Sequence, residues 1–311
     1  MGYACTMINK TAFIFPGQGV QAVGMGADLA RDFPVARMVF DEVDETLHQK
    51  LSHLMFEGDL ETLTETHNAQ PAIMAVSVAA FRVLQSETGV VPDMVAGHSL
   101  GEYSALCVAD VLGLSDTAKL LSLRGQAMAR ACDQNSGGMV ALLGATPAQA
   151  EELATANGCY VSNDNAPGQI VLSGTITNLE KAKSHAVKMG IKRVVLLPVN
   201  GAFHSPLMQS AADEMHAILS SIKFNPAKVP VYFNVTADID VECAHYADLL
   251  QRQIVAPVRW RELVQNMNAT RVVECGPGTV LSGLVRRILP QAETCAVGTT
   301  ADVNLFQNGK V

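Results

Sequence analysis

A serine between two glycines is the feature of the sequence that most directly indicates chemistry. Gly97–Gly101 reads Gly-His-Ser-Leu-Gly and fits the G-x-S-x-G pattern. An apolar run, Met94–Ala96, precedes it, and a helical pattern, Glu102–Ala109, follows it. The glycines would allow a strained turn that presents Ser99 at a helix N-terminus, where backbone N–H groups and the helix dipole favour an oxyanion. The pattern predicts a nucleophilic serine, with an ordinary serine in a glycine-rich turn as the alternative.

A nucleophilic serine needs a base, and His204 is the best placed of the eight histidines. It lies in the loop 201–206, between an expected strand and an expected helix. His98 is a poorer candidate, because neighbouring residues on a sharp turn point in different directions. The alternative for His204 is a hydrogen-bonded structural or surface histidine.

The position of Arg124 in the sequence favours a substrate that carries a negative charge. The helical pattern after Ser115 has an apolar stripe, which consists of Ala118, Leu121, Gly125 and Met128. Arg124 falls on this stripe, three residues after Leu121 and four before Met128. A buried guanidinium requires an anionic partner, because an unpaired buried charge is too costly. We expect the substrate to supply that anion if the protein does not. The alternative is a side chain that reaches water from the edge of the stripe.

Two other glycine-rich turns do not indicate nucleotide binding. Residues 17–22 match G-x-G-x-x-A after a strand. However, Asp41 and Glu42, about 20 positions on, lie in a helical pattern and not at the end of a second strand, so we reject a dinucleotide site. We interpret Gly276–Gly278 as a strand-to-helix connector. No HExxH, CxxC or clustered Asp/His pattern predicts a metal site.

The length and composition of the chain argue against several classes of protein. A chain of 311 residues suffices for one large α/β domain, with or without a smaller inserted one. The formal net charge of −8 argues against a nucleic-acid-binding protein. Seven scattered cysteines favour a reducing compartment, and we expect the cytoplasm. The longest clean apolar stretch, Ala72–Phe81, is too short to span a membrane. Gly2–Thr6 fits the loose myristoylation pattern, which we attribute to chance.

The segment from about residue 137 to 199 has the β-α-β-β-α-β order of a ferredoxin-like unit. Its strands are expected at Met139–Leu143, Tyr160–Asn163, Ile170–Ser173 and Arg193–Val199. Capping boxes at Thr146 and Thr177 would begin its helices, and Gly158 and Gly190 would end them. We therefore predict a ferredoxin-like subdomain at residues 134–202, inserted into a larger α/β catalytic subdomain formed by residues 1–133 and 203–311.

The larger subdomain would hold the remaining strands and most of the helices. Its strands are expected at Thr11–Phe15, Met94–Ala96, Val229–Phe233 and Arg271–Glu274. A helix is expected around Ala247–Gln253, and another after Gly278. In this arrangement Ser99 follows directly after one strand, and the chain re-enters the larger subdomain close to His204.

Several blocks of sequence occur together in an order that is typical of one family. They are Phe15–Gly19, Gln70–Ala72, Gly97–Glu102, Arg124–Gly125, Asn165–Gln169, Ala202–Ser205, Pro257–Trp260 and Glu274–Gly278. With these blocks the chain resembles the malonyl-CoA:acyl carrier protein transacylase family over nearly its whole length. The resemblance implies an α/β-hydrolase-like large subdomain, a ferredoxin-like small one, and a site in the cleft between them.

The resemblance also implies roles for individual residues. Ser99 would be the nucleophile, His204 the general base, and Arg124 the clamp for a malonyl carboxylate. The backbone N–H groups of Gln18 and Leu100 would form the oxyanion hole. The backbone carbonyl of the residue at position 253, a glutamine, would orient the histidine.

Two further residues are expected at the acyl pocket, Asn165 as a lining residue and Phe203 as a barrier to a methyl branch on the substrate. The expected substrate is malonyl-CoA and the expected acceptor an acyl carrier protein, with no permanently bound cofactor and no metal. We expect a monomer that binds neither nucleic acid nor membrane. The sequence does not distinguish a carrier of fatty-acid synthesis from one of polyketide synthesis.

Two other functions fit parts of the pattern. A proofreading acyl hydrolase or thioesterase shares the serine and the histidine, but water completes its reaction. Arg124 argues against it, because a hydrolase of ordinary acyl chains has no use for a cation in the acyl pocket. A non-catalytic module that docks carrier proteins is the second alternative, and the intact Ser99, His204 and Arg124 argue against that.

Overall fold

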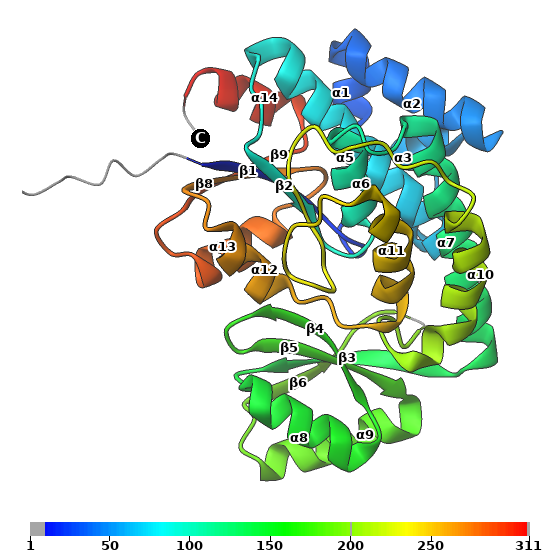
Figure 1. The fold of residues 1–311 in the computed structure, drawn as a ribbon, viewed down its shortest axis with the longest axis vertical. Helices are drawn as coiled ribbons and strands as arrows, with labels where there is room; N and C mark the ends of the chain where they lie inside the picture. The colour runs from blue at the N-terminus through cyan, green and yellow to red at the C-terminus, as the bar shows by residue number, and fades with distance from the viewer. Residues whose placement is uncertain (1–9, 200, 310–311) are drawn as a thin grey trace, which may run out of the picture.

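Two β-sheets organise the part of the chain that the computed structural model describes, residues 10–199 and 201–309 (Figure 1). The sequence pattern at Gly2–Thr6 lies outside these residues. The larger sheet is parallel and consists of β1 (Thr11–Phe15), β2 (Met94–Gly97), β7 (Val231–Tyr232), β8 (Arg271–Cys275) and β9 (Glu293–Val297). Its order is β7-β2-β1-β8-β9. Parallel sheets are usually covered on both faces, which fits the apolar runs that predicted these strands.

Side chains that alternate along β1 reach two different cores. Phe13 lies in an apolar cluster with α5 (Thr66–Thr88) on one face of the sheet. Ile14, the next residue, lies in a second cluster with α12 (Trp260–Met267) and α13 (Val280–Ile288) on the other. Because successive residues of a strand point to opposite faces, five residues suffice to join both layers.

The remaining helices of this subdomain contribute their buried apolar side chains to the first cluster, the one that contains Phe13. They are α1 (Ala27–Asp32), α2 (Pro34–Leu47), α3 (Leu51–Glu57), α4 (Leu60–Thr64), α6 (Gly101–Val108), α7 (Leu114–Gln134), α10 (Gln209–Leu219), α11 (Tyr246–Val255) and α14 (Thr300–Gln307), with short 3-10 helices at Pro206–Met208 and Cys243–His245. None of the helices in the described residues combines the length and the apolar character that a bilayer crossing requires.

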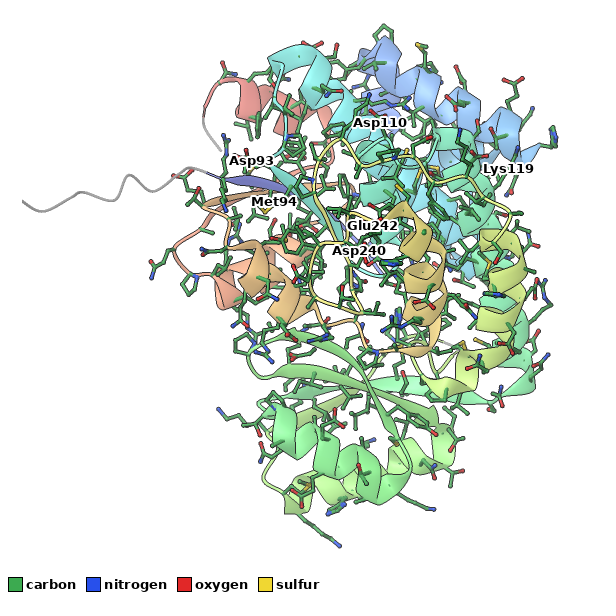
Figure 2. All side chains as sticks on the ribbon, in the orientation of Figure 1. Asp93, Met94, Asp110, Lys119, Asp240 and Glu242 are labelled. Atoms are coloured by element: carbon green, nitrogen blue, oxygen red, sulfur yellow. The ribbon has the colours of Figure 1, made fainter. Side chains whose placement is uncertain are left out.

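The start of the sheet is fixed by a side chain at the edge of β2. The carboxylate of Asp93 accepts a hydrogen bond of 2.7 Å from the backbone N–H of Thr11, and Figure 2 shows Asp93 and Met94 beside the beginning of β1. Met94 pairs with Ala12 in the same register. This contact aligns β2, and therefore the turn that follows it, with the centre of the sheet.

The second sheet is antiparallel and belongs to the small subdomain. Its elements in chain order are β3 (Gly137–Leu143), α8 (Pro147–Asn157), β4 (Tyr160–Ala166), β5 (Gln169–Thr175), α9 (Ile176–Lys188) and β6 (Arg193–Leu196). The strand order β4-β5-β3-β6 and the β-α-β-β-α-β succession confirm the ferredoxin-like fold. Figure 1 shows α8 and α9 on the face of the sheet away from the large subdomain. The exact domain boundaries at 133/134 and 202/203 stay predictions.

The observed ends of some elements differ from the expected ones. The capping box predicted at Thr177 is wrong: Thr175, the last residue of β5, caps α9 by accepting a hydrogen bond from the Asn178 N–H. Strand and helix therefore follow each other without a loop. The predicted box at Thr146 is confirmed in both halves. The strand expected from Val229 begins only at Val231, after a proline, which has no N–H to donate.

Hydrogen bonds and an ion pair join the two subdomains at β4. The Asp164 N–H donates to Val258 O at 3.0 Å, and the Val258 N–H donates to Ser162 O at 2.9 Å. The Asp164 carboxylate also pairs with the Arg261 guanidinium of α12 at 2.6 Å. These contacts place the inner face of the small sheet opposite the carboxyl ends of β1 and β2, where ligands bind in α/β folds.

Candidate active site

Ser99 lies on a sharp turn between β2 and α6. Its φ of 54° is in the left-handed region, which costs a residue other than glycine about 1 to 3 kcal/mol. The flanking glycines are required by close approach of backbone: a Cβ on Gly97 would lie 1.9 Å from the Gly101 carbonyl, and one on Gly101 would lie 2.2 Å from Phe15 O. The predicted strand, turn and helix are confirmed, and the turn presents the Ser99 hydroxyl to a cavity.

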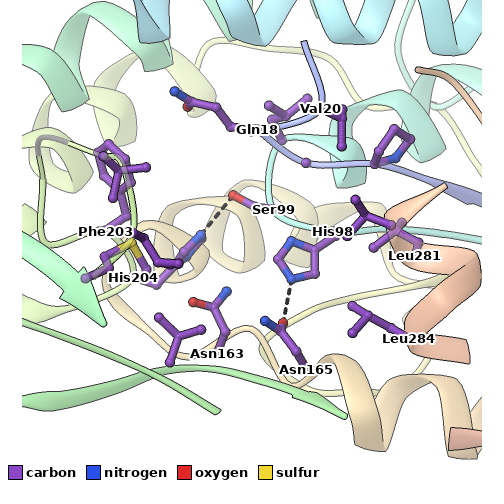
Figure 3. Close-up of a pocket in the computed structure, with 18 of the residues that line it drawn as sticks. Gln18, Val20, His98, Ser99, Asn163, Asn165, Phe203, His204, Leu281 and Leu284 are labelled. Atoms are coloured by element: carbon purple, nitrogen blue, oxygen red, sulfur yellow. Dashed lines mark hydrogen bonds between the residues drawn. The ribbon is translucent and has the colours of Figure 1, made fainter. Parts of the chain in front are cut away.

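His204 faces that hydroxyl, as Figure 3 shows. Its Nε2 lies 2.8 Å from Ser99 Oγ, and its Nδ1 lies 2.7 Å from the backbone oxygen of Gln253. Because a carbonyl oxygen only accepts, Nδ1 carries the proton, and Nε2 is left to accept from the serine. His98 points elsewhere, with its Nε2 2.9 Å from Asn165 Oδ1. The geometry therefore favours His204 over His98 as the base.

The protonation of His204 follows from its surroundings. Burial first, and then the charge of the neighbouring Arg124 guanidinium, lower the pKa of His204 to about 3. The hydrogen bond to the Gln253 carbonyl acts in the opposite direction. The imidazole is consequently neutral at pH 7 and able to accept a proton.

Arg124 is buried beside the serine, so its side chain does not reach water. One guanidinium nitrogen, Nη1, donates to Gln70 Oε1 at 2.6 Å. The other, Nη2, donates to Gln253 Oε1 at 2.9 Å and to Ser99 Oγ at 3.3 Å. Among the described residues no carboxylate lies within ion-pair distance of it. The cation that was expected to need an anion is held by neutral amide oxygens.

A buried acid nearby does not supply the missing charge. Burial raises the pKa of Glu102 to about 8, although the Asn234 N–H and the Arg124 charge act to lower it. Its carboxyl group is therefore mostly protonated at neutral pH. The positive charge of Arg124 thus remains available to a bound anion.

Two backbone N–H groups near Ser99 are free to bind an oxyanion. Those of Gln18 and Leu100 donate to no acceptor within residues 10–199 and 201–309. The Ser99 N–H, in contrast, donates to Asn234 Oδ1 at 2.8 Å. Gln18 is held in place through its side chain, which accepts a hydrogen bond of 3.0 Å from Thr66 Oγ1. The oxyanion-hole role that the family resemblance implies for Gln18 and Leu100 stays a prediction.

The cavity in front of Ser99 lies between the subdomains and has a volume of about 200 Å³. That suffices for a short acyl group but not for a whole coenzyme A molecule. The large subdomain lines it with Gln18, Val20, His98, Leu281 and Leu284, and the small one with Met139, Asn163, Asn165, Gln169 and Val171 (Figure 3). Phe203 lines it beside the histidine. Both expected pocket residues, Asn165 and Phe203, are therefore at the cavity.

Comparison with known proteins identifies the family. An acyl transferase domain model matches residues 12–302. The malonyl CoA-acyl carrier protein transacylase of Bacillus subtilis (strain 168) is 43% identical over 306 residues, which cover 96% of each chain. The chain belongs to the malonyl-CoA–acyl carrier protein transacylase family. It is an acyltransferase with the two-subdomain fold of that family.

Solved structures of transacylases agree with this fold. An acyl-carrier-protein S-malonyltransferase from Bartonella henselae superposes with a TM-score of 0.92 at 42% identity, covering 97% of this chain and 99% of that one. A malonyl-transacylase in complex with a type II PKS acyl-carrier protein has a TM-score of 0.92 at 36% identity, covering 96% and 99%. The α/β assignment with its inserted ferredoxin-like unit is thereby confirmed.

Several polar side chains of the site were not singled out from the sequence. Gln70 connects Arg124 to Thr66, since its Nε2 donates to Thr66 Oγ1 at 2.8 Å. Asn234 contacts the backbone of Ser99, and the side chain of Gln253 contacts both Arg124 and Ser99. Buried amides at positions 70 and 253 are unusual in otherwise apolar helical faces, which is the signal that the sequence offered. In the described residues no group of three or more His, Cys, Asp and Glu side chains is arranged to hold a metal ion.

We predict that kcat/KM for acylation of the wild type stays level as the pH falls from about 8 to about 6, because His204 remains neutral throughout this range. In Arg124→Ala one cause of the low pKa of His204 is removed. The acidic loss of acylation by acetyl-CoA should therefore begin at a higher pH than in the wild type. Rapid-quench measurement of acyl-enzyme across the pH range tests both statements. A wild-type inflection near pH 6.5 would contradict a neutral, strongly buried base.

Proposed function

We propose that the chain transfers a malonyl group from malonyl-CoA to the pantetheine thiol of an acyl carrier protein through an ester on Ser99. The observation that carries the proposal is the Arg124 guanidinium, which has no carboxylate partner among the described residues and lies 3.3 Å from Ser99 Oγ. Malonyl differs from acetyl by one carboxylate, and a guanidinium can bind a carboxylate through two parallel hydrogen bonds. The names of the relatives describe the same transfer.

In the first half-reaction, Ser99 Oγ attacks the thioester carbonyl carbon while His204 Nε2 takes the hydroxyl proton. The carbonyl oxygen becomes an oxyanion, which accepts hydrogen bonds from the Gln18 and Leu100 N–H groups. The C–S bond then breaks, and the protonated His204 gives its proton to the coenzyme A thiolate. Malonyl remains as an ester on Ser99.

The second half-reaction repeats these steps in reverse with the carrier. The pantetheine thiol gives its proton to His204 and attacks the ester carbonyl. The same oxyanion donors serve the second tetrahedral intermediate. The C–O bond breaks, and Ser99 recovers its proton from the imidazolium. Ping-pong kinetics follow, because coenzyme A leaves before the carrier reacts.

The orientation of His204 depends on a carbonyl where many serine enzymes use a carboxylate. The Gln253 oxygen accepts from Nδ1 at 2.7 Å, which fixes the tautomer and the plane of the ring. A carboxylate in its place would add a negative charge close to Arg124. We therefore attribute the use of a carbonyl to the need to keep Arg124 available for the substrate.

The acceptor is an acyl carrier protein, and a relative solved with a type II PKS acyl-carrier protein supports that class of partner. We propose a monomer that acts in the cytoplasm without a permanently bound cofactor or metal. Release of free malonate in place of malonyl-carrier would favour the hydrolase alternative, so product analysis in the presence of carrier separates the two.

Ser99→Ala should abolish the malonyl-enzyme adduct, because the proposed covalent acceptor is removed. Ser122→Ala, which removes a hydroxyl from α7 outside the cavity, should leave adduct formation unchanged. Intact-protein mass spectrometry after incubation with malonyl-CoA measures both. An adduct of unchanged yield on Ser99→Ala would exclude the serine mechanism.

Arg124→Ala should reverse the acyl selectivity of the enzyme without destroying catalysis. Loss of the guanidinium leaves a malonyl carboxylate unpaired in a buried site, which should lower malonyl transfer by at least about a hundredfold. Acetyl transfer should hold steady or rise. Arg124→Lys should restore malonyl transfer poorly, because an ammonium group cannot reproduce the two parallel hydrogen bonds.

The measurement is kcat/KM for malonyl-CoA and acetyl-CoA with one carrier protein. Arg130→Ala is the matched control, since Arg130 is an exposed arginine of the same helix, α7. Its loss should affect both substrates little. Equal losses of malonyl and acetyl transfer in Arg124→Ala would instead assign Arg124 to the fold or to coenzyme A binding.

A smaller side chain at Phe203 should raise methylmalonyl loading relative to malonyl loading. Phe203 lines the cavity next to His204, so its ring limits the space at the α-carbon of the acyl group. One methyl group in an apolar pocket is worth about 1 to 3 kcal/mol, and we expect a shift of roughly tenfold for Phe203→Ser. Competition between the two acyl-CoA substrates measures the ratio. A wild type that loads both equally would show that Phe203 is not the selector.

A further inference from the structure

Asn234, in the loop after β7, contacts the turn that carries Ser99 on both sides. Its side-chain Oδ1 accepts from the Ser99 N–H at 2.8 Å, and its Nδ2 donates to Gly97 O at 2.7 Å. The residue is fully buried, and it is not among the residues that line the cavity. The side-chain amide of Asn234 therefore bridges the turn from Gly97 to Ser99.

Asn234 is in turn held by a residue of α6. Its backbone N–H donates to Glu102 Oε2 at 2.6 Å, and the Glu102 N–H donates to Ser99 O at 3.0 Å. Gln253 Nε2 also donates to Ser99 O, at 2.9 Å. Ser99, Asn234 and Glu102 thus form a closed ring of hydrogen bonds, here called the elbow ring, and both backbone groups of Ser99 are engaged.

The elbow ring acts on the left-handed backbone conformation of Ser99, which sets the direction of its side chain. At φ 54° the Ser99 side chain points to His204, and the next N–H, that of Leu100, is left without an acceptor among the described residues. If Ser99 relaxed to an ordinary φ, both the hydroxyl and the Leu100 N–H would turn. The Asn234 amide also occupies the Ser99 N–H, which limits the oxyanion donors to the following residue and to Gln18.

We propose that Asn234 is a positioning residue for acyl transfer, whose side-chain amide holds Ser99 in its left-handed conformation. The proposal rests on the proposed role of Ser99 as nucleophile. Asn234 does not line the cavity, and its side chain reaches the rest of the site through Gln253, whose Nε2 lies 3.5 Å from Asn234 Oδ1. Its effect is therefore on the alignment of the attacking oxygen and the oxyanion donors, and not on the binding of malonyl-CoA.

Asn266 provides a control variant for the effect of anchoring the loop after β7 without a contact to Ser99. Asn266 Nδ2 donates to Ala237 O at 2.9 Å and so holds the same loop from α12. It has no contact with the elbow ring. Asn266→Ala removes one side-chain-to-backbone hydrogen bond from the loop, and it should lower the unfolding temperature while leaving the acylation rate near that of the wild type.

The experiment compares Asn234→Ala, Asn234→Asp and Asn266→Ala with the wild type. Single-turnover acylation by malonyl-CoA gives the rate and the half-saturating concentration separately. The labelling rate of Ser99 by a small sulfonyl fluoride, which has no carboxylate and no coenzyme A, reports the reactivity of the hydroxyl alone. Circular dichroism melting shows that each variant is folded.

For Asn234→Ala we expect acylation to slow by about a hundredfold, the loss that a small displacement of a reacting group causes. The half-saturating concentration should stay within about threefold, and sulfonyl fluoride labelling should slow in parallel. Asn234→Asp keeps the acceptor for Ser99 but places an oxygen against Gly97 O, and should lose at least about tenfold in the same rates. Because aspartate has the same shape as asparagine, Asn234→Asp provides the test if Asn234→Ala does not fold.

A folded Asn234 variant that acylates and labels within about twofold of the wild type would overturn the proposal. So would a rise in half-saturating concentration at an unchanged maximal rate, since this would assign Asn234 to substrate binding. Mapping the label to Ser99 by mass spectrometry keeps the two hypotheses apart. A malonyl adduct that persists on Ser99→Ala would reject the proposed function, whereas fast acylation of Ser99 in Asn234→Ala would reject only the role of Asn234.

Discussion

Burying a guanidinium costs free energy unless an anion pairs with its charge. At Arg124 no side chain of the described residues supplies that anion. Its hydrogen bonds go to Gln70 and Gln253, whose oxygens are polar but carry no charge. The acid in the neighbourhood, Glu102, is kept mostly protonated by burial. A site with this arrangement is stable enough to fold and still has a positive charge to offer. In the proposed function, an acyl group with its own carboxylate completes the pairing, and an acyl group without one does not.

The same charge governs the base. Arg124 helps to lower the pKa of His204, so the imidazole is neutral but weakly basic in the free enzyme. A malonyl carboxylate bound to Arg124 would offset that repulsion, and the pKa of His204 would rise in the complex. We therefore expect His204 to become a stronger base when an anionic acyl group is present. In the proposed mechanism, selectivity and catalysis are linked because both depend on the Arg124 charge beside Ser99.

The sequence predicted the parts of this site that depend on local pattern. Ser99 sits between glycines that only a tight turn explains, and Arg124 interrupts an apolar stripe, so both could be found from spacing. The loop position of His204 favoured it as the base. The amide partners Gln70 and Asn234 could not be found, because each comes from a segment far from the residue it contacts, Arg124 or Ser99, and nothing in the local sequence predicts the contact. The elements at the end of the chain, β9 and α14, were also missed, because a five-residue strand and a short capped helix have weak periodic signals. The misplaced cap at Thr177 has a similar cause, since a strand that runs directly into a helix leaves no loop to mark the boundary.

The inserted subdomain affects the site through the loop 201–206, where the chain returns to the large subdomain. The loop 201–206 carries Phe203 and His204, and Ser173 of β5 donates a hydrogen bond of 2.6 Å to Phe203 O. The small sheet is anchored to the large subdomain at Val258, a few residues after Gln253, whose carbonyl orients the histidine. A shift of the small sheet would therefore move the cavity wall and the base together, while Ser99 stayed fixed by the turn after β2. The parallel sheet thus holds Ser99 in its strained turn, and the inserted sheet holds part of the structure that faces Ser99.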